Sequence, residues 1–302
     1  MLQRRTDLAV EAHDLWKESA ARETTLPGVR ARDDTREGYP VTRVEILDHQ
    51  GARALGKPEG QYVTLELSGL ERREPEALPR AVRAIAAELT ALLGSLPAQA
   101  PVLVVGLGNR AITPDAIGPK TVEHTLVTRH LVSGAPEHFA PFRPVAALVA
   151  GVLGTTGVES GELARAVAEH IRPSCIIAVD ALASRSLKRV CRTVQLSDTG
   201  ISPGSGVGNH RHALDRSTLG VPVLAVGVPT VVDAATLAAD VLSEAGGADL
   251  DPEALMGAGD GLIVTPKDID AQMTDLSKVL GYAITLALQP HLTLADAELL
   301  LS

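Results

Sequence analysis

The sequence has 302 residues, of which 45% are hydrophobic but only 2% aromatic, and its formal net charge is −9. Such a length suits one large domain or two smaller ones, and the core must be built from Val, Leu, Ile and Ala. An acidic chain lacks the basic face of a general nucleic-acid binder, so no direct nucleic-acid partner is expected. No apolar run reaches the roughly 18 residues of a membrane span, and the start lacks the apolar core of a secretory signal. We therefore expect a cytoplasmic protein without a membrane partner.

The N-terminal part of the chain predicts a helix, a loop and two strands. Residues 1–20 carry apolar side chains at helical spacing, namely Leu8, Ala12, Leu15 and Trp16. Residues 21–40 are polar and highly charged, which indicates a solvated loop. Residues 41–47 and 62–67 alternate apolar and polar side chains, which is typical of half-exposed strands. These strands predict an antiparallel flanking subdomain over residues 41–70.

From residue 78 the pattern changes to buried strands that alternate with helices. Strands are expected at residues 102–105, 145–150, 175–179, 190–196 and 222–227. Helices are expected at residues 78–92, 119–132, 161–171 and 233–244, and a last helix follows Pro266 after a Gly/Asp-rich loop over residues 246–260. The alternation predicts an α/β fold with a mostly parallel sheet and helices on both faces. We expect a single α/β domain over residues 1–302, with the antiparallel flank attached.

Two aspartates follow buried strands and are the candidate catalytic residues. Asp115 lies between two prolines after the predicted strand 102–105 and the glycines Gly106 and Gly108 that follow it, and a second buried strand ends on Asp180. Open α/β sheets bind ligands outside the carboxyl ends of their strands. Two carboxylates there can activate water and protonate a leaving amine, or hold a divalent metal. The alternative is that Asp115 caps a helix and Asp180 only bonds to local amides.

Four long motifs resemble the germination protease family of spore-forming bacteria. They are TPDAIGPKTVEHTLVTRHL at residues 113–131, AVDALASRS at 178–186, SDTGISPGSGVGN at 197–209 and GVPTVVDAATLA at 227–238. The resemblance runs from Arg5 to about Pro290. It implies an endopeptidase of the spore core that begins to degrade small acid-soluble spore proteins at germination, made as a zymogen and assembled as a homotetramer. It also implies that Asp115 and Asp180 are the catalytic residues.

Substrate-binding candidates lie beside these aspartates and in a glycine-rich loop. They are Asn109, Arg185, Gly204, Ser205 and Gly206. The loop can offer backbone N–H groups to an oxyanion or to an extended peptide, or it can simply link two strands. Arg185 and Lys120 can hold a carboxylate ionised or bind an acidic side chain, or they can be ordinary surface cations.

A metal ligand set is not assigned, so no cofactor is certain and a divalent metal is an open alternative. The pattern is also similar, more distantly, to hydrogenase-maturation endopeptidases, in which two acidic residues and a His bind metal together. Here Ser202 stands where the germination protease family commonly has His, and a hydroxyl is a poor metal ligand. His210 and His212 lie close by in the sequence, although surface positions on a polar turn are the simpler interpretation.

Other catalytic classes lack their motifs. The sequence holds no HExxH and no GxxxxGK[ST], and Cys175 lies inside a predicted strand. Two alternatives therefore stay open: a metal-dependent maturation peptidase, and a non-catalytic protein that binds peptide or phosphate with its glycine loops. Asp233 is expected to cap a helix.

The resemblance further implies that a leader is removed ahead of the TDLAVE motif. We expect a leader of Met1 to Arg5 at most. The following residues, Thr6 to Ala9, resemble the acidic and apolar sites that the family cuts, which makes self-cleavage a hypothesis.

Overall fold

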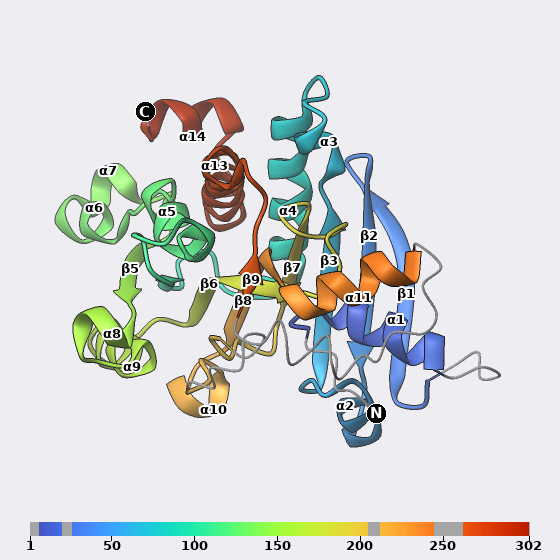
Figure 1. Cartoon of the computed structure of the whole chain (residues 1–302). Helices are drawn as coiled ribbons and strands as arrows, with labels where there is room; N and C mark the ends of the chain where they lie inside the picture. Colours follow the sequence, from blue (N-terminus) through green and yellow to red (C-terminus); the bar gives the residue numbers. More distant parts are fainter. Residues whose placement is uncertain (1–5, 20–25, 205–211, 245–261, 302) are drawn as a thin grey trace.

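The computed structural model describes residues 6–19, 26–204, 212–244 and 262–301 (Figure 1). Its strands form one sheet in the order β1-β2-β3-β7-β8-β6-β4-β5, and β9 pairs with β8. The strands are β1 (Val29–Arg36), β2 (Tyr39–Ile46), β3 (Gly60–Glu66), β4 (Val102–Leu107), β5 (Val145–Gly151), β6 (Cys175–Ser184), β7 (Thr193–Ser197), β8 (Val223–Asp233) and β9 (Ile263–Val264). The expected α/β class is confirmed.

The four strands β8, β6, β4 and β5 pair in parallel and form the centre of the fold. Their residues alternate between two apolar cores. Val102 and Val104 of β4 belong to one core, whereas Leu103 and Val105 of the same strand belong to the other. A strand that is buried on both faces needs apolar side chains at every position, which explains why these strands read as continuous apolar runs.

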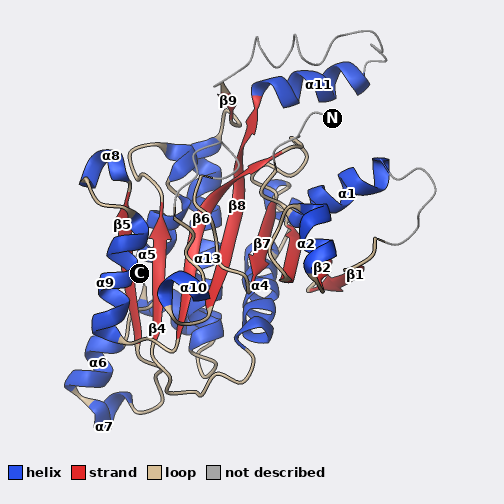
Figure 2. Cartoon of the chain, turned by 90° about the horizontal axis from the view of Figure 1, so that it is seen from below, coloured by secondary structure: helices blue, strands red, loops and turns tan. Residues whose placement is uncertain are grey.

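Helices cover both faces of the sheet, as expected. The longer ones are α1 (Ala9–Ser19), α4 (Ala77–Leu93), α9 (Ser160–Ile171), α11 (Ala234–Glu244) and α13 (Ile269–Leu288). The shorter ones are α2 (His49–Leu55), α3 (Ser68–Glu71), η1 (Thr113–Asp115), α5 (Ile117–Glu123), α6 (Arg129–Gly134), α7 (Pro136–Phe139), α8 (Leu153–Thr156), α10 (Arg216–Leu219) and α14 (Leu294–Leu300). Figure 2 shows α9 and α10 over one face, with α4 and α13 behind the strands. In the described part of the chain, no helix is both long and apolar enough to cross a membrane.

The antiparallel flank is larger than predicted and belongs to the same sheet. β1, β2, β3 and β7 pair antiparallel, and β7 joins the flank to the parallel strands through β8. The prediction of a loop over residues 21–40 is wrong for β1 and for the start of β2. The sequence of β1 is mostly charged and gives no alternating apolar face, and the strand is exposed along most of its length. Its pairing with β2 makes it a strand.

Two further predictions need correction. The helix expected at residues 119–132 is broken into α5 and α6, because α13 packs directly against the break. A β-carbon at Gly281 of α13 would lie 2.4 Å from the carbonyl oxygen of His124, and the N–H of Leu126 donates to the hydroxyl of Thr285 at 3.0 Å. The strand expected at residues 190–196 begins only at Thr193, and Cys191 precedes it in a left-handed conformation.

A buried carboxylate ties α4 to the antiparallel flank. Glu88 of α4 is 1% exposed and receives hydrogen bonds from Arg43 of β2 at 2.5 and 2.7 Å and from Arg36 of β1 at 3.0 Å. Burial by itself raises the pKa of Glu88, but the hydrogen bonds and charges of the two arginines outweigh burial, so this pKa lies below its usual value. The ionised form of Glu88 therefore stabilises the folded protein.

We predict that Glu88→Gln lowers the free energy of unfolding by about 1.5–3 kcal/mol near neutral pH, as expected for hydrogen bonds to a charged group. Because the folded-state pKa is lowered, this contribution is fully present above the unfolded value of 4.5 and is lost as the pH falls through the folded-state pKa. Urea unfolding of both proteins across this pH range measures the difference. Glu45→Gln is the control, because its partner Arg30 is 64% exposed and the change should stay below about 1 kcal/mol. A difference that grows on acidification would contradict the prediction.

Candidate functional site

The two candidate aspartates lie where β4 ends and β6 continues beyond it. β4 pairs with β6 only as far as Gly106 and Val179, and β6 then continues beside β8 to Ser184. The expectation that Asp180 ends its strand is therefore wrong, because β6 runs four residues further. Asp180 is nevertheless the first residue of β6 beyond the parallel pairing with β4.

A close backbone contact brings the Asp115 loop to this edge. A β-carbon at Gly118, at the start of α5, would lie 2.2 Å from the carbonyl oxygen of Leu107 and 2.5 Å from that of Val179. No side chain fits there, so the beginning of α5 rests directly on the end of β4 and on Val179 within β6. Asp115 precedes Gly118 by three residues, and Asp180 follows Val179. The turn η1, which contains Asp115, packs against β6 and β8.

Asp115 is held by the loop that follows β4. Its Oδ2 accepts a hydrogen bond from the N–H of Asn109 at 2.7 Å, and its carbonyl oxygen would lie 2.1 Å from a β-carbon placed on Gly108. The side chain of Asn109 in turn accepts from the N–H of Ala111 at 3.0 Å. Asn109 thus contacts the candidate carboxylate through its backbone, while its side chain shapes the loop.

Asp180 is more enclosed than Asp115. Its residue is 5% exposed, and its Oδ1 accepts from the N–H of Ala181 at 2.9 Å, whereas Asp115 is only half-buried. A water molecule therefore has easier access to Asp115 than to Asp180. The arrangement joins one accessible and one enclosed carboxyl group at the same sheet edge, and both accept backbone N–H groups.

The glycine-rich loop is described only in part. Gly204 has a left-handed φ of +74° and is half-buried, and Ser202 and His212 are exposed. Ser205, Gly206 and His210 lie outside the described residues. Within residues 6–19, 26–204, 212–244 and 262–301, no three His, Cys, Asp or Glu side chains gather closely enough to hold a metal ion.

Two other predictions can be compared directly with the structure. Asp233 caps α11 as expected, because its Oδ1 accepts from the N–H of Thr236 at 2.9 Å. Cys175 and Cys191 are both buried free thiols. Burial raises the pKa of Cys175 to about 11 and that of Cys191 to about 12, which makes both poor nucleophiles.

The N-terminal segment lies against the same part of β6, a contact that was not predicted from the sequence. The N–H of Arg185 donates to Oε2 of Glu11 at 2.7 Å, and the N–H of Ala183 donates to Oδ2 of Asp7 at 2.9 Å. The sequence did carry a signal. Glu11 falls between Leu8 and Leu15 on the apolar face of the first predicted helix, where a carboxylate requires buried donors.

Lys57 belongs to this group of residues as well. Its ammonium donates to the carbonyl oxygen of Thr6 at 3.2 Å. Burial lowers the pKa of Lys57, and the nearby charges of Asp7 and Glu11 act in the opposite direction. The charged lysine therefore depends on those two carboxylates for compensation.

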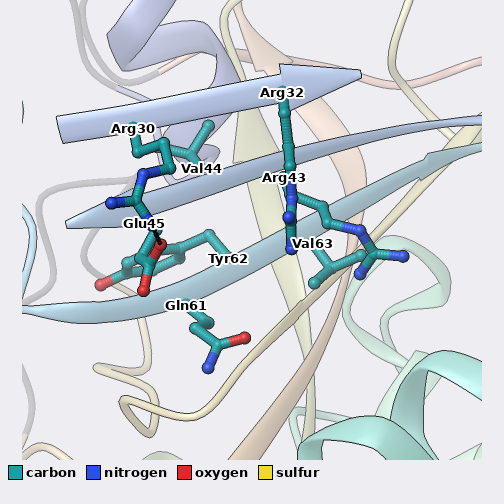
Figure 3. Close-up of a pocket in the computed structure, with 8 residues that line it drawn as sticks. All are labelled: Arg30, Arg32, Arg43, Val44, Glu45, Gln61, Tyr62 and Val63. Atoms are coloured by element: carbon teal, nitrogen blue, oxygen red, sulfur yellow. Dashed lines mark hydrogen bonds and ion pairs between the residues drawn. The ribbon is translucent and has the colours of Figure 1, made fainter. Parts of the chain in front are cut away.

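A separate cavity of about 250 Å³ lies over β1, β2 and β3, away from the two aspartates (Figure 3). Three arginines line it, but Arg30 is paired with Glu45 at 3.1 Å and Arg43 with Glu88 at 2.5 Å. These carboxylates neutralise most of the positive charge. The cavity is therefore a poor candidate for a strong anion site.

Comparison with known proteins identifies the family. A family model described as germination protease matches residues 9–245. The chain is 44% identical to the germination protease of Caldanaerobacter subterraneus subsp. tengcongensis, covering 98% of both chains, and 43% identical to that of Clostridium perfringens, covering 97% of both. It is 46% identical to the germination protease of Halalkalibacterium halodurans over 79% of this chain and 66% of the relative. The chain therefore belongs to the germination protease family and is an endopeptidase, a hydrolase of peptide bonds.

Proposed function

We propose that this endopeptidase cuts small acid-soluble spore proteins during germination and uses Asp115 and Asp180 to do so. The observation that carries the proposal is the contact of Gly118 with the carbonyl oxygens of Leu107 and Val179. This contact brings the loop of one aspartate to the strand of the other, at the point where β4 ends beside its parallel neighbour β6. Family membership supports a protein substrate in spores.

In the proposed reaction, the two carboxyl groups share the work of hydrolysis. One carboxylate takes a proton from the attacking water, and the other carboxyl group gives a proton to the leaving amine. The Asn109 N–H at 2.7 Å from Asp115 and the Ala181 N–H at 2.9 Å from Asp180 fix the orientation of the carboxyl groups. Fixed orientation matters because proton transfer requires the acid and base to lie within hydrogen-bonding distance of the reacting atoms.

The surrounding residues would hold the substrate. Arg185 follows Asp180 by five residues, directly after the end of β6, and its guanidinium can bind an acidic side chain of the substrate. Backbone N–H groups around Gly204 can bind an extended peptide or an oxyanion, together with Ser205 and Gly206. Asn109 contributes by shaping the loop on which Asp115 lies.

The setting of the enzyme follows from the same family. We propose that it acts in the cytoplasm of the spore core, that it assembles as a homotetramer, and that it is made as a zymogen. Neither nucleic acid nor membrane is proposed as a direct partner. A resident cofactor is not part of the proposed reaction.

We predict that Asp115→Asn and Asp180→Asn each lower kcat by about 10²–10⁴-fold, the usual contribution of a general acid or base. An amide keeps the volume of the side chain and can still accept a backbone N–H, so the fold should persist. The measurement is cleavage of a purified small acid-soluble spore protein, with circular dichroism as the check on folding.

Asp48→Asn is the matched control, because Asp48 caps α2 by accepting from the N–H groups of Gln50 and Gly51, a role that Asn can also fill. This variant should cut the substrate at the wild-type rate. Wild-type turnover in either of the two site variants would rule out the proposed aspartate pair.

We predict that Arg185→Ala raises KM about 10–100-fold with a smaller change in kcat. The lost interaction is a charge-assisted hydrogen bond to substrate, worth about 1.5–3 kcal/mol. Initial rates over a range of spore-protein concentrations measure both constants. An unchanged KM would remove Arg185 from the proposed substrate site.

We predict that cleavage continues after dialysis against a chelator, because the proposed reaction routes both protons through carboxyl groups of the chain. Activity and bound metal should be measured on the same sample before and after dialysis. Loss of activity that a divalent metal restores would instead favour the metal-dependent peptidase.

A further inference from the structure

The N-terminal segment occupies the free edge of β6 next to the candidate site. Beyond Val179 this edge of β6 has no β4 partner, and Asp7 takes the place of one. The N–H of Asp7 donates to the carbonyl oxygen of Ala183 at 3.1 Å, and the N–H of Ala183 donates back to Oδ2 of Asp7 at 2.9 Å. The segment therefore completes the sheet at the point where β4 stops.

Glu11 holds the residues that end β6. Its residue is 3% exposed, and its carboxylate accepts hydrogen bonds from the hydroxyl of Ser184 at 2.7 Å, the N–H of Arg185 at 2.7 Å and the N–H of Ser186 at 3.1 Å. One buried carboxylate thus satisfies donors from three consecutive residues. Removing it would leave the partly buried N–H groups of Arg185 and Ser186 without this acceptor, which is costly.

Other contacts hold the segment in place without Glu11. Gln195 of β7 accepts from the N–H of Ala9 at 2.7 Å and donates to the carbonyl oxygen of Asp7 at 3.1 Å. Lys57 donates to the carbonyl oxygen of Thr6 at 3.2 Å. Loss of the Glu11 carboxylate would therefore remove the hydrogen bonds from α1 to residues 184–186 while the segment itself stayed docked.

We propose that Glu11 is a positioning residue, which acts on the substrate through Arg185. The backbone of Arg185 is fixed by Glu11, and the direction of its guanidinium depends on that backbone. This inference rests on the proposed role of Arg185 in substrate binding. It adds a residue of the first helix, 174 positions away from Arg185 in the sequence, to the determinants of substrate affinity.

A double-mutant cycle tests the proposal. Glu11→Gln, Arg185→Ala and the double variant are compared with the wild type for cleavage of a small acid-soluble spore protein. Glu11→Gln replaces one acceptor oxygen with an N–H₂ group that faces donors, and we expect kcat/KM to fall at least about tenfold, mainly through KM. Because Glu11 acts through Arg185, the double variant should match Arg185→Ala within about twofold. A purely structural role would instead give effects that multiply.

Glu66→Gln is the control for the charge change. Glu66 is 47% exposed and pairs at 3.4 Å with Arg189, which also lies 3.7 Å from Glu11. The N–H groups of Arg185 and Ser186, by contrast, donate to Glu11. The control should therefore leave kcat/KM unchanged. If Glu11→Gln does not fold, Ser184→Ala removes one donor to the same carboxylate and goes through the same cycle, with the same expected lack of additivity.

The outcomes separate this inference from the proposed function. A wild-type protein that cuts no spore protein even after removal of the leader would overturn the proposed function. A wild-type protein that cuts, with either multiplying effects or a fully active Glu11→Gln variant, would overturn the role of Glu11 alone. A fully active Arg185→Ala variant would overturn both the substrate role of Arg185 and the action of Glu11 through it.

Discussion

The contact of the start of α5 with the end of β4 and with Val179 of β6 is the constraint on which the candidate site depends. Gly118 lies so close to the carbonyl oxygens of Leu107 and Val179 that a β-carbon would overlap both. Gly106 meets Gly118 in the same way, because a β-carbon on Gly106 would lie 2.5 Å from the carbonyl oxygen of Gly118. These backbone contacts hold the start of α5, and with it the loop that carries Asp115, against β4 and β6.

Strand β8 lies between the parallel and the antiparallel part of the sheet. The N-terminal segment contacts both of its neighbours, β6 and β7. β8 pairs in parallel with β6 and antiparallel with β7. The segment bonds to Ala183 of β6 and to Gln195 of β7, and it buries Leu8 fully. The first residues of the described chain are thus part of the framework around Asp180.

The local sequence pattern predicted strands and helices that have their own apolar face. It failed where only pairing with a neighbouring strand makes a segment adopt its structure. The apolar runs of β4 and β6 and the cap at Asp233 were predicted correctly, because the required side chains are consecutive or a few positions apart. β1 was missed because its charged residues give no periodic apolar signal, and pairing with β2 alone makes it a strand. The extension of β6 past Asp180 likewise depends on its pairing with β8.

The sequence by itself determined the α/β class, the family, and the two aspartates as candidates, since these follow from apolar periodicity and from motifs of contiguous residues. Only the tertiary structure decided that Asp115 and Asp180 lie at one sheet edge and that Glu11 holds Arg185. The physical reason is that a hydrogen bond between residues far apart in the chain leaves no local spacing to detect. A buried carboxylate on an apolar helix face indicates that donors are needed, but the folded chain alone supplies them.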